Sequence, residues 1–510
     1  MRSELTRSIV GSPVAPSLVG NSRARIPWFW AISFLLVPAL IFLLSWIRPT
    51  IGVPIAAALA FALSRFKPSP ADHRVTMTLA AVGFSCVVLY VVGFGEGHYC
   101  WDWFKHWALL NTIAEGPWPT EVTLQDQTLS LRFYIAAYLI PGLIHKVVPL
   151  VSVRSAAAIG FGIGYASVFL TLARATPGRP APVLIATACV ALTLAGADFL
   201  AGNLLRALGT SKVNDLFGLH YEWWFAHASG RLLQFPSMIA ALLWVPHQSV
   251  ATIIVALIWS SAASLTGLRA ALLAYGALSL WSPFGMLGLL PLVATVLWIN
   301  RRQVFDHTSS IYAAVALAFS ITVASYIAHD APPVGLSFAA MAHNLAAYPD
   351  YLPFLIIELT PYVLLLRRRI LREPVLVASV VTLAILPILE GRPGDLVMRA
   401  SIGPLAVLSL TAAQALLDDL RAGKWRIALV ALLLSVPTVT SEVAYHVQRG
   451  AAYQRLAPDD PMDEPWVKVF AKGEQIGLQE FFDTCGWRYV PQYFSNDPAR
   501  VLRVRQAGEP

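Results

Sequence analysis

The stretch from Gly95 to Leu131 holds the densest group of reactive side chains in the sequence. It follows an apolar run and contains five carboxylates, one lysine, two histidines and four tryptophans. Asp102, Lys105 and His106 stand at i, i+3 and i+4, so a helix would place them on one face. We expect this helix to lie at a membrane interface with Asp102 as the catalytic acid or base. An ordinary amphipathic loop helix is the alternative.

Further candidates stand at the ends of apolar runs, where ionisable groups are costly and often functional. Asp198 ends one run in LAGADFLAG, although it could equally be an acid that emerges into water. His220 and Glu222 lie in HYEWWFAH among tryptophans, which suits a sugar ring or a lipid headgroup, or simply an aromatic belt. His247 stands at the start of another apolar run.

Two arginines could bind an anion near the outer end of the spans. Arg399 lies near the start of a late apolar run, four residues after Asp395. A buried arginine there would suit a phosphate, which its planar guanidinium group recognises well. An Asp395 to Arg399 ion pair that stabilises the start of a helix is the alternative. Basic residues are expected on the inner side of the membrane, but Arg154 lies at the outer end of a descending span. This exception suggests an anionic partner.

The composition indicates a polytopic membrane protein. Of the 510 residues, 57% are hydrophobic and 13% charged, and the mean hydropathy is +0.62. Soluble proteins carry about 25% charged residues. The net charge of +8 comes largely from short basic clusters between apolar runs, so it indicates membrane topology and no nucleic-acid partner. No P-loop, HExxH, GxSxG or dinucleotide-binding motif occurs in a usable context.

The hydropathy pattern predicts an all-α polytopic membrane protein with about thirteen transmembrane helices. Residues 1–441 form the membrane domain, with outer loops 95–152 and 198–246, and residues 442–510 form an external tail. Residues 131–150 are long enough to cross, but every later basic cluster falls inside only if they form a juxtamembrane helix on the outer surface. The N-terminus is then cytoplasmic.

Two of the four cysteines lie in polar segments on the predicted outer side. A bond between Cys100 and Cys485 would tether the tail over the acidic loop. Two unpaired thiols that are too far apart to meet are the alternative.

The organisation of Val75 to Leu200 resembles the GT-C superfamily of membrane-embedded glycosyltransferases, which includes protein O-mannosyltransferases and aminoarabinose transferases. Members have an acid in the first large outer loop, a juxtamembrane helix, an arginine at the outer end of the next descending span and acids in later outer loops. Asp102, the segment 132–144, Arg154 and Asp198 occupy these places. Two spans precede the one that leads to the acidic loop, and the paired prolines before the juxtamembrane helix are missing.

The chain also resembles a set of bacterial polytopic membrane proteins with D-W-x-K-H, E-W-W, W-V-P-Q-H and M-R-x-S-I-P elements. The first two are intact at residues 102–106 and 222–224. His247 and Gln248 stand in reversed order, and Gly403 precedes Pro404. These elements imply no activity of their own.

The resemblance implies a GT-C-like transferase of the bacterial inner membrane with a periplasmic tail. It would move a sugar from a polyprenyl-phosphate donor, embedded among membrane lipids, to an acceptor on the outer side. Asp102 would act as general base, Arg154 or Arg399 would meet the phosphate, and Asp198 or Glu222 would orient the acceptor or hold a divalent cation. A lipid or polysaccharide transporter and a structural subunit of an envelope assembly are the alternatives.

Overall fold

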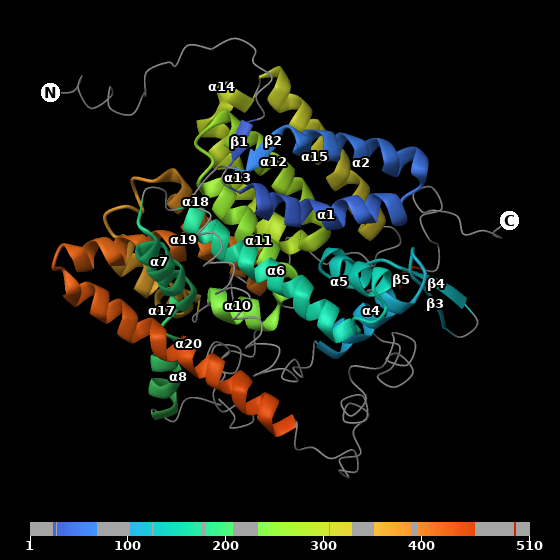
Figure 1. The fold of residues 1–510 in the computed structure, drawn as a ribbon. Helices are drawn as coiled ribbons and strands as arrows, with labels where there is room; N and C mark the ends of the chain where they lie inside the picture. Colours follow the sequence, from blue (N-terminus) through green and yellow to red (C-terminus); the bar gives the residue numbers. More distant parts are fainter. Residues whose placement is uncertain are drawn as a thin grey trace.

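The structure, a computed structural model, describes residues 24–26, 28–68, 103–124, 127–175, 179–207, 233–304, 306–328, 351–389, 395–453 and 494–495. These residues are mostly helical and agree with an all-α membrane protein (Figure 1). The apolar run at residues 75–94, which precedes the first predicted outer loop, lies outside them.

The helices of the described residues follow one another in chain order. They are α1 (Phe29–Ser45), α2 (Pro49–Ser64), α4 (Trp103–Glu115), α5 (Ala136–Val147), α6 (Val153–Arg174), α7 (Ala181–Thr193), α8 (Asp198–Ala207), α10 (Met238–Trp244), α11 (Pro246–Ser260), α12 (Leu265–Trp281), α13 (Pro283–Ile299), α14 (Arg301–Val304), α15 (His307–Ala328), α17 (Tyr351–Leu366), α18 (Pro374–Ile385), the 3-10 helix η4 (Leu386–Leu389), α19 (Asp395–Arg421) and α20 (Trp425–Tyr453).

Five apolar stretches in the described ranges are long enough to cross a membrane by length and composition. They are Val153–Arg174, Pro182–Leu204, His307–Ala328, Leu396–Arg421 and Trp425–Tyr445. Six shorter apolar helices accompany them: α1, α2, α12, α13, α17 and α18 with its 3-10 extension. The total of thirteen spans stays a prediction.

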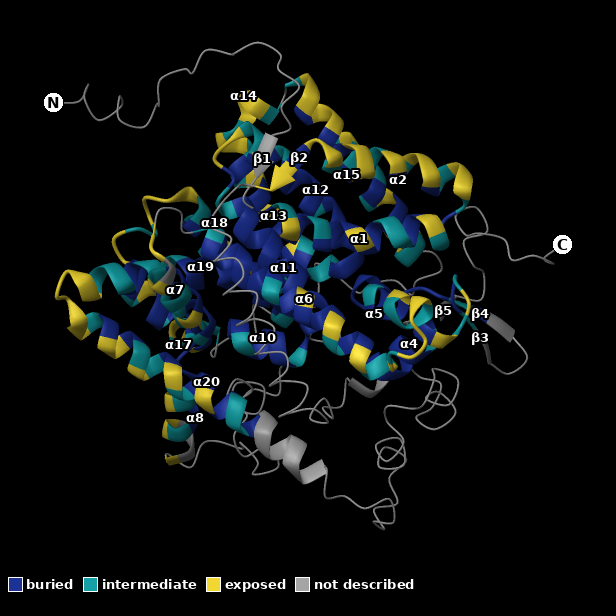
Figure 2. Ribbon diagram, viewed as in Figure 1, coloured by how far each residue is buried: buried dark blue, intermediate teal, exposed yellow. Residues whose placement is uncertain are grey.

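Helix α11 forms the centre of the fold. Its residues from Pro246 to Trp259 are all buried, and it contacts α6, α12, α13 and α19 (Figure 2). The long apolar run explains this position, since a helix that is apolar on every side is stable only when neighbours cover it. The polar residues at its first turn, His247 and Gln248, are therefore held at a fixed point of the core.

Two glycines bring α13 and α19 close together beside that point. A Cβ on Gly288 would overlap the backbone of Ala400, and one on Gly403 would lie 2.5 Å from Leu289 Cδ2. Small residues of this kind let helix backbones approach closely in membrane proteins. The glycine that precedes Pro404 thus has a packing role, next to the helix turn that carries Arg399.

The first two helices form a hairpin. Helices α1 and α2 contact each other along their lengths. The chain just before α1, strand β1 (Ala24–Ile26), pairs in parallel with β2 (Phe66–Pro68) just after α2. The start of α1 and the end of α2 therefore lie side by side.

A small antiparallel sheet joins two segments far apart in the sequence. Strand β3 (Glu121–Leu124) pairs with β4 (Gln127–Leu131), and β4 pairs with β5 (Phe494–Ser495) from the predicted tail. In Figure 1 these strands lie beside α4 and α5. The tail thus returns to the first predicted outer loop through backbone pairing. Cys100 and Cys485 both lie outside the described residues.

The helices of the structure differ from the predicted segments at two places. Helix α5 has 12 residues, or about 18 Å, against about 30 Å for a bilayer core. Residues 131–150 therefore do not form one continuous crossing helix. Helix α20 continues to Tyr453, so the predicted domain boundary at residue 442 lies inside this helix.

Candidate functional site

Helix α4 begins directly after Asp102, so the expected helix is present. Its first turn carries Lys105 and His106, and the His106 side chain is buried. Nearly all residues from His106 to Ala114 are buried as well, because α4 packs against α5 and contacts α6. Other parts of the chain therefore cover this helix, and its place at a membrane interface stays a prediction.

His106 meets a second predicted residue, His247, in the interior. Their ring centroids are 4.1 Å apart, and His106 Nδ1 lies 2.6 Å from the hydroxyl oxygen of Tyr138 on α5. Both histidines and Tyr138 are at most 2% exposed. The two imidazole rings and the Tyr138 hydroxyl group therefore form one buried cluster of hydrogen-bonding groups.

A third predicted residue, Arg399, reaches the same place from α19. Its Nη1 atom donates to the hydroxyl oxygen of Tyr134 at 2.6 Å, and its guanidinium carbon lies 5.8 Å from the ring centroid of Phe284. Only 3% of the arginine is exposed. The side chain is thus held in one orientation by a hydrogen bond and an aromatic face.

Gln248 connects the arginine to the histidines. Its Nε2 atom donates to Tyr134 Oη at 3.0 Å and lies 3.0 Å from His247 Nε2. Ser282 Oγ donates to Gln248 Oε1 at 3.1 Å, which sets the orientation of the amide. Ser282 also caps α13 by accepting from Gly285 N at 3.0 Å. The start of α13 is therefore built into the same hydrogen-bonded unit.

We call this unit the basic network. Its members are His106, Tyr134, Tyr138, His247, Gln248 and Arg399.

An apolar pocket adjoins the basic network. It lies between α1, α5, α6, α11 and α12 and is lined by Phe34, Ile140, Phe161, Val250 and Trp281, among others. Ala137 and Pro246 also line it, and each directly precedes a network residue in the sequence. The pocket has room for about one water molecule, so it provides an apolar surface beside the network.

A second polar region surrounds an interruption in an apolar stretch. Residues Leu194 to Ala197 separate α7 from α8 and are all buried. Their backbone groups bond to other helices. Leu194 O accepts from Tyr362 Oη (3.1 Å), Ala195 O from Ser435 Oγ (2.8 Å) and Gly196 O from Thr438 Oγ1 (3.1 Å), whereas Ala197 N donates to Ile357 O (3.1 Å). Irregular backbone inside a membrane protein requires such partners.

Buried acids gather at this interruption. Asp198, the first residue of α8, is fully buried, so the alternative that this acid simply emerges into water is wrong. A Cβ on Gly196 would overlap a Glu358 carboxylate oxygen and lie 2.9 Å from Asp198 Oδ2, so the two carboxylates are neighbours. Glu442, also fully buried, follows one turn after Thr438 on α20 and accepts from Trp244 Nε1 at 3.3 Å.

In the described chain, the buried acidic side chains thus lie in a different region from the buried basic side chains. The three buried acids lie on α8, α17 and α20. The buried basic side chains lie on α4, on α11, on α19 and just before α5: His106, His247, Arg399 and Arg132. Helix α10 lies between the two regions, since Trp244 contacts Glu442 and the next helix opens with Pro246 and His247.

The remaining candidate residues either are not members of the basic network or are not fully described in the structure. Arg154 is in the first turn of α6, half-buried, and is not a member of the basic network. Lys105 and Asp395 lie in α4 and α19, but their side chains are not described. Asp102, His220 and Glu222 lie outside the described residues. Within the described ranges, no three His, Cys, Asp or Glu residues are grouped as a metal site.

The sequence matches no protein-family model, and comparisons with curated proteins and with solved structures returned no match. The chemistry of the site is therefore inferred from its own residues. The basic network offers buried hydrogen-bond donors that can bind an anion, and apolar side chains line the small pocket beside it.

Proposed function

We propose that the chain is a membrane-embedded glycosyltransferase that moves a sugar from a polyprenyl-phosphate donor to an acceptor on the outer side of the bacterial inner membrane. The observation that carries this proposal is the basic network beside an apolar pocket. A phosphate with a prenyl tail needs hydrogen-bond donors next to an apolar surface, and this place offers both.

In this proposal, Arg399 binds the donor phosphate, with Tyr134 fixing the direction of its guanidinium group. The acceptor hydroxyl attacks the anomeric carbon while Asp102 takes its proton. The bond between that carbon and the phosphate oxygen breaks, and polyprenyl phosphate leaves. Hydrogen bonds from His106 or His247 stabilise the charge on the departing phosphate. General-base catalysis typically contributes about 10²–10⁴ in rate.

Other residues take supporting roles. Asp198 or Glu222 orients the acceptor or holds a divalent cation, and Arg154 is the alternative partner for the phosphate. The N-terminus lies in the cytoplasm and the tail in the periplasm, where its strand β5 joins the loop that carries Asp102.

A strain that lacks the protein tests the proposal. Its lipid and glycan profile should lose one product that the wild-type gene restores. Asp102→Asn should fail to restore it while the protein is inserted at normal levels, because the change keeps the shape but removes the proton acceptor. Asp306→Asn is the matched control, since Asp306 is an exposed acid paired with Arg269, and it should restore the profile. Restoration by Asp102→Asn would refute the general-base role.

A carrier of lipids or polysaccharides is the second candidate, and the interrupted helix favours it. Secondary transporters place their ion sites at such interruptions, and Glu358 lies in the middle of the apolar helix α17. Release of polyprenyl phosphate in detergent, where no transport is possible, separates the two candidates. A transferase should release it both as the wild type and as Glu358→Gln. A carrier should release none, whether wild type or variant.

A further inference from the structure

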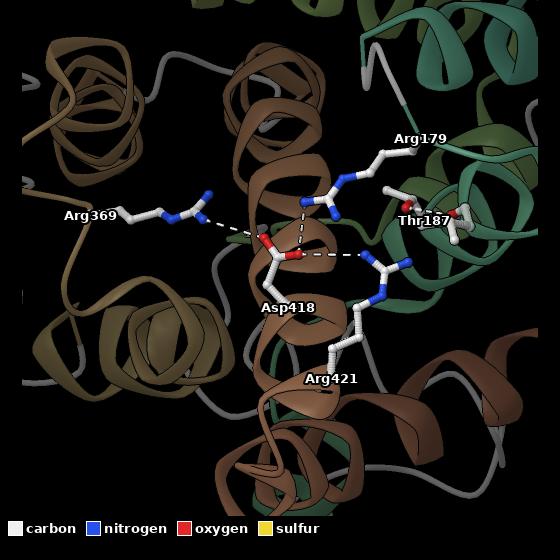
Figure 3. Close-up of polar contacts among 6 residues, drawn as sticks. Arg179, Thr187, Arg369, Asp418 and Arg421 are labelled. Atoms are coloured by element: carbon white, nitrogen blue, oxygen red, sulfur yellow. Dashed lines mark hydrogen bonds and ion pairs between the residues drawn. The ribbon is translucent and has the colours of Figure 1, made fainter.

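One carboxylate at the end of α19 is surrounded by three arginines (Figure 3). Asp418 Oδ1 lies 2.8 Å from Arg179 Nη2 and 3.8 Å from Arg421 Nη1, and its Oδ2 lies 3.7 Å from Arg369 Nη2. The arginines come from the α6–α7 connection, the turn after α17 and the last turn of α19. We call these four residues the Asp418 cluster.

The Asp418 cluster carries more positive than negative charge. One carboxylate balances one guanidinium group, which leaves two positive charges. Only Arg179 is within hydrogen-bond distance, because contacts of 3.7 and 3.8 Å are ion pairs without a hydrogen bond. Among the described residues, Asp418 is the only acid that these arginines contact. Their side chains are 39–44% exposed, so N–H donors remain available to a ligand.

Exposed apolar side chains flank these charges. Leu371, between Arg369 and Arg372, is 89% exposed, and Leu420, next to Arg421, is 42% exposed. A surface that binds a water-soluble anion has no need of such leucines. Arginines next to apolar side chains are typical of the boundary between headgroups and acyl chains. The stretch Leu396–Arg421 is itself long and apolar enough to cross a membrane, and the cluster lies at its end.

We propose that the Asp418 cluster binds the headgroup of an anionic phospholipid in the adjoining leaflet. The phosphate oxygens accept hydrogen bonds from Arg369 and Arg421, and the acyl chains lie against Leu371 and Leu420. Two surplus charges match a headgroup with two phosphates better than one with a single phosphate. Basic sites between helices at the cytoplasmic surface bind lipids in this way. This site is separate from the proposed transferase chemistry.

Native mass spectrometry of the full chain in nanodiscs can test this. The nanodiscs would contain a neutral phospholipid with a small fraction of phosphatidylglycerol or cardiolipin. Wild type should retain an anionic lipid, cardiolipin best. Arg369→Gln with Arg421→Gln should bind it about 25-fold more weakly, since each basic residue near an anionic surface contributes about a factor of five. The matched control, Arg301→Gln with Arg302→Gln on the exposed helix α14, should keep it.

Asp418→Asn separates lipid binding from a purely structural ion-pair cluster. It raises the surplus from two charges to three, so a lipid site should bind more tightly. Weaker binding in this variant would overturn the proposal, as would unchanged binding in the double arginine variant. Displacement of the lipid by soluble pyrophosphate at equal concentration would assign the cluster to a soluble anion and overturn it too.

Discussion

Tyr134 joins two parts of the basic network, because its hydroxyl group meets both Arg399 and Gln248. Tyr134→Phe leaves the ring but removes the hydroxyl, so a buried guanidinium group loses a hydrogen bond. We expect a loss of about 1–3 kcal/mol in the free energy of unfolding and weaker binding of polyprenyl phosphate. Thermal unfolding and a lipid-binding measurement check the two effects.

Tyr275→Phe is the matched control for this substitution. Its hydroxyl donates to Met286 O at 3.0 Å, away from the basic network. The control should lower stability without changing lipid binding. If both variants bound polyprenyl phosphate as well as the wild type, Tyr134 would have no part in orienting Arg399.

At the residue scale, the sequence predicted part of the site. His106 stood out through its spacing from Asp102 and Lys105, and His247 and Arg399 because ionisable residues near the ends of apolar runs are costly. Tyr134 and Tyr138 did not, since aromatic residues in an amphipathic segment are common at membrane interfaces. Glu358 was missed although it stands alone in an apolar helix, and Glu442 was assigned to the tail. Their partners come from distant helices, which local patterns do not reveal.

The interruption between α7 and α8 is the element on which the acidic region depends. Thr438 supports it with two bonds, donating to Gly196 O and accepting from Phe199 N, both at 3.1 Å. Thr438→Val keeps the shape and removes both bonds. We expect a loss of about 1–3 kcal/mol in the free energy of unfolding, because buried backbone groups are left without partners.

Thr322→Val provides the comparison for Thr438→Val in chemical or thermal unfolding. Thr322 is also buried, but its hydroxyl bonds only to Ala318 O of its own helix. This variant should be nearly neutral. Equal stability of the two variants would mean that Thr438 does not support the interruption.

At the element scale, long apolar runs predicted helices well, and α1, α2 and α6 all form in such runs. The interruption at residues 194–197 was not predicted, because these residues continue an apolar run that was expected to end only at Asp198. Side chains from α17 and α20 stabilise it, and those helices are more than 150 residues away in sequence. Tertiary contacts thus override the local helical preference.

The arrangement of the whole molecule in the membrane rests on its basic clusters and can be tested by labelling. We expect a cysteine at Leu150 to react with an impermeant maleimide from outside and one at Lys424 to react only after the membrane is opened. Both positions are exposed, and the four native cysteines would be replaced first. Protection of Leu150→Cys in intact cells would mean that the proposed orientation is inverted or that residues 131–150 contribute to a crossing.

At this scale, the sequence predicted a helical membrane protein but not how its distant parts meet. The pairing of Phe494 with Leu131 joins the tail to the first outer loop through backbone groups. Neither segment has side chains that indicate the other. The close approach of α13 and α19 beside the basic network likewise depends on packing at Gly288, which only the folded chain reveals.

The most direct test of the central claim is the binding of polyprenyl phosphate to the purified full chain, measured by native mass spectrometry. Wild type should bind one molecule, and Arg399→Gln should bind at least about tenfold more weakly, because a charge-assisted hydrogen bond contributes about 1.5–3 kcal/mol. Arg301→Gln, an exposed arginine on α14, should bind like the wild type. Equal binding by folded Arg399→Gln and wild type would contradict the proposal that the basic network holds the donor phosphate.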